Sequence, residues 1–153
     1  VAFGNQHSAT ALSMTATASA LLSLDRLDEA GALYNEALVT LAALFGPDNT
    51  QSVPSYNSLT RIALANGGIP KDCRNSQRAV SLVATSSAPD ALPNLYANAL
   101  LLACQSRRGE HADLSTLRKQ VAAYRAKAPA DDPFLPVLNG LLRPAVRETA
   151  QPD

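Results

Sequence analysis

Apolar and polar residues alternate with a helical rhythm along most of the chain, most regularly over residues 24–49. Apolar side chains recur there at intervals of three and four, the spacing of one helical face: Leu27, Ala30, Leu33, Tyr34, Ala37, Leu38, Leu41 and Leu44. Asp28 and Glu29 occupy the first turn, where carboxylates complement the positive end of the helix dipole. Gly46-Pro47 predicts the end of the helix, because glycine can take a left-handed cap and proline cannot continue a helix.

The rest of the chain divides in the same way into further helices. Pro54 and Pro70 stand where first turns are expected, and a missing amide is tolerated there. Gly67-Gly68 is a strong stop. We therefore expect helices at 8–24, 51–66, 70–85, 90–108, 112–128 and 133–142, with residues 1–8 as a loop. Residues 1–142 would form one domain and 143–153 a flexible tail.

A repeat connects these helices. The dipeptide Phe-Gly at positions 3 and 45 and the dipeptide Pro-Asp at positions 47 and 89 both recur after 42 residues. A fixed period of this size is typical of helical arrays, in which no single unit can bury its apolar face alone. Each unit is predicted to be a helical hairpin.

The spacing of nine residues in the first unit resembles the tetratricopeptide repeat (TPR), in the long-period form of kinesin light chains and many bacterial regulators. These residues are Met14, Ala18, Leu21, Asp25, Leu27, Ala30, Tyr34, Ala37 and Leu38. The resemblance covers roughly residues 3–128, and it is weaker in the second unit, where Asp72 and Ser76 replace a small and an aromatic residue.

The resemblance implies an all-α, TPR-like right-handed superhelix of three helical hairpins plus a C-terminal capping helix. Phe134 and Leu138 of the helix at 133–142 would cover the open end of the stack. The family acts mainly through protein or peptide partners. We therefore expect a binding scaffold, as one module of a larger bacterial regulatory or assembly protein, since the chain starts within a predicted loop. The alternative is homo-oligomerisation by stacking of the terminal repeat faces.

Asn57 and Arg61 lie one turn apart, at positions that face the concave groove in TPR proteins. An arginine beside an asparagine can hold a carboxylate through charge-assisted hydrogen bonds. The equivalent positions are Thr15 and Ser19 in the first unit and Asn98, Leu102 or Ala103 in the third. The candidate groove residues are thus Thr15, Ser19, Asn57, Arg61 and Asn98. The alternative is a solvated helix face, and it applies equally to the pair Asn94 and Asn98.

Cys73 and Cys104 fall on adjacent helices that should pack antiparallel, and they lie about equally far from the loop between them. They could form a disulfide, or they could be two unrelated small core residues. A disulfide would indicate a periplasmic or extracellular location, and free thiols a cytoplasmic one.

Charge and spacing argue against several other functions. The chain carries 13 basic and 13 acidic residues, so nothing indicates nucleic acid or an anionic membrane. No apolar run is long enough to span a bilayer. His7 and His111 do not combine with the cysteines in a metal-ligand spacing. A nucleophilic pair of Cys104 and His111 would need an exposed, electropositive setting. We expect no catalytic site, metal or cofactor.

Overall fold

The computed structural model describes residues 2–110 and 113–143, with side chains from residue 8 onward. These residues form helices without any β-strand, so the all-α prediction is confirmed. The α-helices are α1 (Ala2–Ser23), α2 (Leu27–Phe45), α3 (Val53–Leu64), α4 (Arg74–Ser86), α5 (Leu92–Arg107), α6 (Leu114–Lys127) and α7 (Leu135–Leu141). Short 3-10 helices flank α3, namely η1 (Thr50–Ser52) and η2 (Ala65–Gly67).

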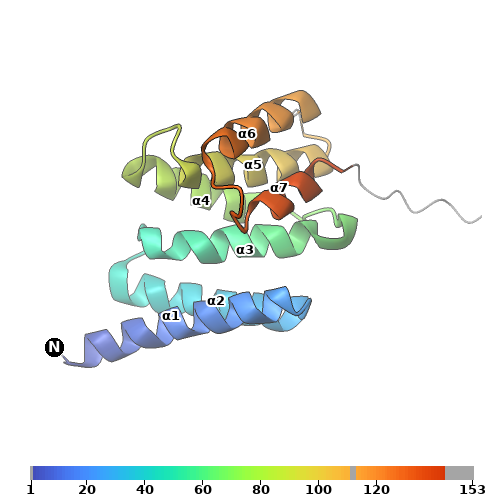
Figure 1. Cartoon of the computed structure of the whole chain (residues 1–153). Helices are drawn as coiled ribbons and strands as arrows, with labels where there is room; N and C mark the ends of the chain where they lie inside the picture. The colour runs from blue at the N-terminus through green and yellow to red at the C-terminus, as the bar shows by residue number, and fades with distance from the viewer. Residues whose placement is uncertain (1, 111–112, 144–153) are drawn as a thin grey trace, which may run out of the picture.

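The helices stack in the order of the sequence. Each helix contacts the next one along the chain, α3 also contacts α1 and α5, and α7 packs on α5 and α6. Figure 1 shows α1 and α2 at one end, α3 across the middle, and α4, α5 and α6 at the other end. The short helix α7 lies in front of α5, on the side of α3. This arrangement leaves one long side of α3 between α1 and α7.

Three apolar clusters hold successive helices together. Small residues with no exposed surface, such as Ala18 and Ala30, let α1 and α2 approach closely around the buried ring of Tyr34. The second cluster joins α3, α4 and α5 through Val53, Ala79, Leu82, Val83 and Ala97. The third and largest joins α3, α5, α6 and α7 through Leu64, Leu95, Tyr96, Ala99, Leu100, Ala103, Leu117, Val121, Tyr124 and Leu138. No cluster is complete without residues from at least three helices.

Local signals fixed most helix ends correctly. Gly46 and Gly67 have φ angles of 81° and 78°, which glycine adopts without the strain of a Cβ atom. Pro54 stands in the first turn of α3, as expected. Asp113 accepts a hydrogen bond from the backbone N–H of Thr116 and caps the start of α6.

Two predicted helix starts were wrong. Helix α1 begins at Ala2 rather than at residue 8, because the first Phe-Gly pair lacks the proline that follows Gly46. Helix α4 begins at Arg74 rather than at Pro70. A carboxylate oxygen of Asp72 accepts from the backbone N–H of Arg74 at 3.1 Å, which delays the start. The predicted tail, apart from residue 143, lies outside the described residues.

Of the two alternatives for Cys73 and Cys104, the structure has the disulfide. The sulfur atoms of Cys73 and Cys104 lie 2.07 Å apart and join the start of α4 to α5. The Arg108 guanidinium supports the same segment, because it donates to the carbonyl oxygens of Pro70, at 3.0 Å, and Lys71. The connection between α3 and α4 is thus attached to α5 at two points.

Candidate peptide-binding groove

A groove runs along the open side of α3, between α1 and α7. It consists of two adjoining hollows, and Arg61 lines both. We call them the aromatic half, of about 410 Å³, and the arginine half, of about 620 Å³. The floor comes from α3 because Val53, Asn57, Arg61 and Leu64 follow the helical spacing of a single face.

The aromatic half is built where four segments converge. Ser19 comes from α1, Tyr96 from α5, Tyr124 from α6, and Asp132 and Phe134 from the segment before α7. The Tyr96 ring lies 4.6 Å from that of Phe134 and 6.0 Å from that of Tyr124, measured between centroids. Tilted ring pairs at such distances stabilise one another beyond their burial. They hold the segment before α7 against α5 and so define this wall.

Two buried polar groups in the aromatic half have no internal partner. The side chains of Asn57 and Tyr96 are only 8% and 6% exposed. Even so, the Asn57 Oδ1 atom and the Tyr96 hydroxyl make no hydrogen bond with any described residue. Such a group typically lowers stability by about 1–3 kcal/mol. Because both side chains line the groove, a ligand there could supply the missing bonds.

The aromatic half also contains one charge of each sign. None of the ion pairs among the described residues includes Arg61 or Asp132. Burial raises the pKa of Tyr96, the nearby Arg61 guanidinium lowers it, and the Asp132 carboxylate raises it. Part of this lowering of the pKa comes from a hydrogen-bond interaction of Arg61 with the hydroxyl, although the distance and angle between them fall short of a full hydrogen bond. Both charges therefore act on the same hydroxyl group.

Asp132 is held in place by two donors. Its carboxylate accepts from the Tyr124 hydroxyl at 3.1 and 3.2 Å, and from the backbone N–H of Phe134 at 2.8 Å. Burial, and then this bond to Asp132, raise the pKa of Tyr124 to about 12. At neutral pH the Tyr124 hydroxyl therefore stays protonated and remains a donor to Asp132.

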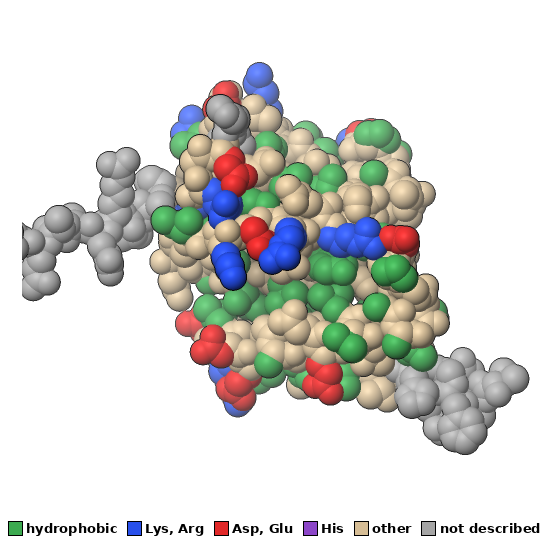
Figure 2. All heavy atoms as spheres, turned by 180° about the vertical axis from the view of Figure 1, so that it is seen from behind, with side chains coloured by type: hydrophobic (Ala, Val, Ile, Leu, Met, Phe, Trp, Pro, Cys, Tyr) green, Lys and Arg blue, Asp and Glu red, His purple; other side chains and the backbone are tan. Residues whose placement is uncertain are grey.

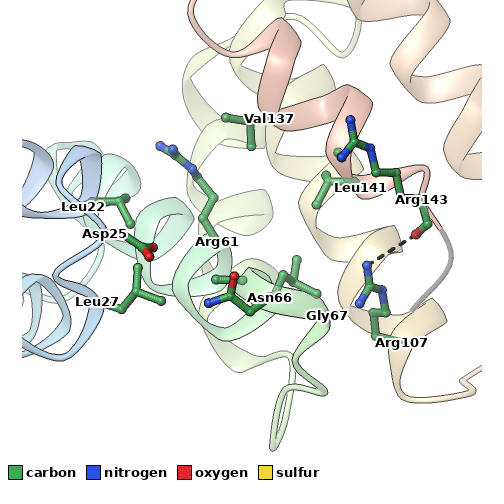
Figure 3. Close-up of a pocket in the computed structure, with 13 residues that line it drawn as sticks. Leu22, Asp25, Leu27, Arg61, Asn66, Gly67, Arg107, Val137, Leu141 and Arg143 are labelled. Carbon is green, nitrogen blue, oxygen red and sulfur yellow. Dashed lines mark hydrogen bonds between the residues drawn. The ribbon is translucent and has the colours of Figure 1, made fainter. Parts of the chain in front are cut away.

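The arginine half is shown in Figure 3. Leu22, Asp25 and Leu27 lie on one side, α7 lies on the other, and Arg61 rises from α3 between them. Arg107 extends from α5 and donates to the backbone oxygen of Arg143 at 3.4 Å. Its Nη1 atom is buried without a partner among the described residues. Arg107 thus lines the arginine half of the groove.

The structure brings together three of the five predicted groove residues. Ser19, Asn57 and Arg61 line the aromatic half, and Ser19 also shares a 2.8 Å hydrogen bond with the Tyr34 hydroxyl. Thr15 and Asn98 line neither half. Their side chains donate to backbone oxygens one turn earlier in their own helices, at 3.1 and 2.8 Å.

Asn94, the neighbour of Asn98 in the predicted pair, has a structural role. It is 3% exposed, and its amide donates to the carbonyl oxygens of Ser87 and Ala88 at 3.0 and 2.8 Å. These bonds supply donors to two carbonyl groups of the loop between α4 and α5. Asn94 does not line the groove.

Among the groove residues that sequence reasoning missed are Tyr96, Asp132, Phe134 and Arg107. Tyr96 lies 39 positions after Asn57, off the 42-residue period. Asp132 and Phe134 enter the groove only because the chain turns back after α6. Asp132 does lie 42 residues after Asp90, but the period alone does not indicate a role in the groove.

The face seen from behind in Figure 2 differs from the groove. Lys and Arg side chains form a row across its middle, with Asp and Glu side chains beside them. Away from the groove, Arg74 pairs with Asp72 at 2.7 Å, Arg78 pairs with Asp48, and Arg108 pairs with Glu110 at 2.5 Å. We call Arg74, Arg78 and Arg108 the outer arginines.

No protein-family model matches this chain, and no characterised protein or solved structure shows significant similarity to it. Its function is therefore inferred from the groove itself. Among the described residues, no three His, Cys, Asp or Glu side chains are grouped to hold a metal. Cys104 is in the disulfide and His111 lies outside the described residues. No helix in the described part of the chain is long and apolar enough to cross a membrane.

Proposed function

We propose that this chain is a scaffold that binds an extended peptide segment of a protein partner in the groove along α3. The observation that carries the proposal is the pair of buried, unpartnered polar groups on Asn57 and Tyr96. A peptide backbone offers one donor and one acceptor at nearly every residue. It can therefore satisfy both groups, whatever its side chains are.

The dimensions of the groove suit such a ligand. Helix α3 has 12 residues, which corresponds to a length of about 18 Å. An extended chain advances about 3.3 Å per residue, so about five or six residues would span the floor. The walls contain both apolar side chains, such as Leu22, Pro93 and Val137, and polar ones. This mixture is typical of sites that orient a ligand through a few polar groups.

The positions of the helix ends support a TPR-like superhelix. Helices α2, α4 and α6 end at residues 45, 86 and 127, at intervals of 41 residues. Helices α1, α3 and α5 end at residues 23, 64 and 107, at intervals of 41 and 43. In a TPR-like array the first helix of each hairpin would line the inner face, and α1, α3 and α5 all contribute residues to the groove.

The disulfide supports an oxidising compartment, either the periplasm or the extracellular space. We propose that the chain acts there as one module of a larger regulatory or assembly protein.

The alternative of end-to-end stacking has no specific support. It would depend on Phe134 and Leu138 being available at the end of the stack. Leu138 is fully buried in the third cluster, and Phe134 packs on Tyr96. Changes at Leu138 would therefore alter folding rather than test self-association.

A displayed library of random 12-residue peptides tests the proposal. We expect the oxidised parent protein to enrich a set of peptides. These peptides should bind the double variant Asn57→Ala/Arg61→Ala at least tenfold more weakly than they bind the parent. The variant should keep the far-UV circular dichroism spectrum of the parent. Arg78→Ala is the matched control, since Arg78 lies outside the groove, and it should bind like the parent. Equal binding by the parent and the groove variant would exclude the groove as the site.

A further inference from the structure

We propose that the aromatic half of the groove selects peptides that carry a basic and an acidic residue a few positions apart. The basic side chain would lie against Asp132 and Phe134, and the acidic one against Arg61. This inference rests on the proposed function and specifies its ligand.

Asp132 has the properties of a cation-binding group. Its carboxylate is oriented by the Tyr124 hydroxyl and the Phe134 backbone N–H, but it pairs with no Lys or Arg of the described chain. The ring of Phe134, two residues along, is 39% exposed. A carboxylate beside an accessible aromatic ring attracts an ammonium or guanidinium group by both charge and cation–π interaction. A lysine or arginine of the ligand would supply that group.

Arg61 has the complementary properties. Its guanidinium lines both halves of the groove and has no carboxylate partner among the described residues. The Asn57 Oδ1 atom, one turn earlier on the same face, has no donor and can accept a ligand backbone N–H. An aspartate or glutamate of the ligand could then accept charge-assisted bonds from Arg61.

The two charges together give the site a direction. Both act on the Tyr96 hydroxyl, so they lie in the same half of the groove. A peptide with matching charges would be attracted at both points. A peptide with the charges exchanged would place like charges together, which is how charged sites reject a wrong ligand. Arg61 and Asp132 would together determine both the direction in which the peptide lies and which peptides are accepted.

The experiment compares the peptides that three forms of the protein select from the same 12-residue library. The parent should enrich peptides with a Lys or Arg and an Asp or Glu a few positions apart. Asp132→Asn should lose the basic preference alone, and Arg61→Gln the acidic preference alone. Asp132→Asn keeps an oxygen that can accept from Phe134, and the melting temperature of each variant will show whether it still folds.

A synthetic pair of peptides completes the test. One is a selected sequence, and the other has its basic and acidic residues exchanged. We expect the exchanged peptide to bind the parent at least tenfold more weakly. This inference is wrong if the selected peptides lack the basic residue, if they lack the acidic residue, or if the exchange leaves the affinity unchanged. In each of these cases the proposal of peptide binding would still stand. If the parent enriches no peptides that the Asn57→Ala/Arg61→Ala variant does not also enrich, the proposed function fails as well.

Discussion

The outer arginines and the groove arginines are used in different ways. Arg74, Arg78 and Arg108 each contact a carboxylate of the same chain. Arg61 and Arg107 pair with no carboxylate among the described residues, although Asp25 and Asp132 also line the groove. The same residue type thus completes the structure on one side and keeps its charge available on the other.

The buried polar groups show the same contrast. Outside the groove, Ser76 of α4 and Asn94 of α5 are buried and donate hydrogen bonds to backbone oxygens. In the groove, Asn57 and Tyr96 are buried without partners among the described residues. The contrast holds only in part, because the fully buried hydroxyl of Ser55 on α3 also has no partner in the described part of the chain and lines neither half of the groove. A fold selected for stability alone would pair such groups or replace them with apolar ones. The comparison supports the proposal that stability and binding are carried by different sides of α3.

The largest expected effect on stability comes from removing the disulfide that joins the start of α4 to α5. Replacing both cysteines, as Cys73→Ala/Cys104→Ala, should lower the free energy of unfolding by about 3–4 kcal/mol. The bond closes a long loop, with a sequence separation of 31, and so restricts the unfolded chain. Urea denaturation with and without reductant measures this. With reductant, the parent should be as stable as the double variant, which reductant should not affect. A parent whose stability does not respond to reductant would contradict the assignment.

A smaller effect, of opposite sign, is expected in the groove. Tyr96→Phe removes a buried hydroxyl without a partner, so it should raise the free energy of unfolding by up to about 1 kcal/mol. The same change should weaken peptide binding, because the ligand loses one hydrogen bond. Thermal unfolding and fluorescence anisotropy with a selected peptide measure the two quantities. A loss of stability would show that the hydroxyl has a structural partner.

The smallest effect is expected at an outer arginine. Arg78→Gln breaks an exposed ion pair with Asp48 and should lower the free energy of unfolding by less than about 1 kcal/mol. The loss should shrink further at high salt, where surface charges are screened. Peptide affinity should not change. A clear loss of affinity would mean that ligand contacts extend beyond the groove.

Local chemistry explains what could be predicted from the sequence. The end of α2 follows from Gly46-Pro47, and the floor of the groove at Asn57 and Arg61 follows from the resemblance to the TPR pattern. The register of two adjacent antiparallel helices placed Cys73 and Cys104 side by side, but it left open whether they form a disulfide. Each of these expectations depends on one element or on a pair of neighbours.

Competition between signals and tertiary packing explain what could not be predicted. Pro70 is a good first-turn residue, but Asp72 accepts from the Arg74 backbone and shifts the start of α4. Asp132 and Phe134 reach the groove because apolar residues of α7, above all Leu138, bury themselves against α5 and α6. That contact depends on the whole stack, so the 42-residue period of the sequence does not indicate it.

The most direct measurement is a double-mutant cycle between the protein and a selected peptide. It combines Arg61→Gln with replacement of the acidic peptide residue by its amide, and it measures affinity by calorimetry. We predict a coupling energy of at least about 1 kcal/mol for Arg61, and none in the same cycle with Arg78→Gln. Zero coupling at Arg61, or equal coupling at both arginines, would contradict the division between a stabilising outer side and a binding groove.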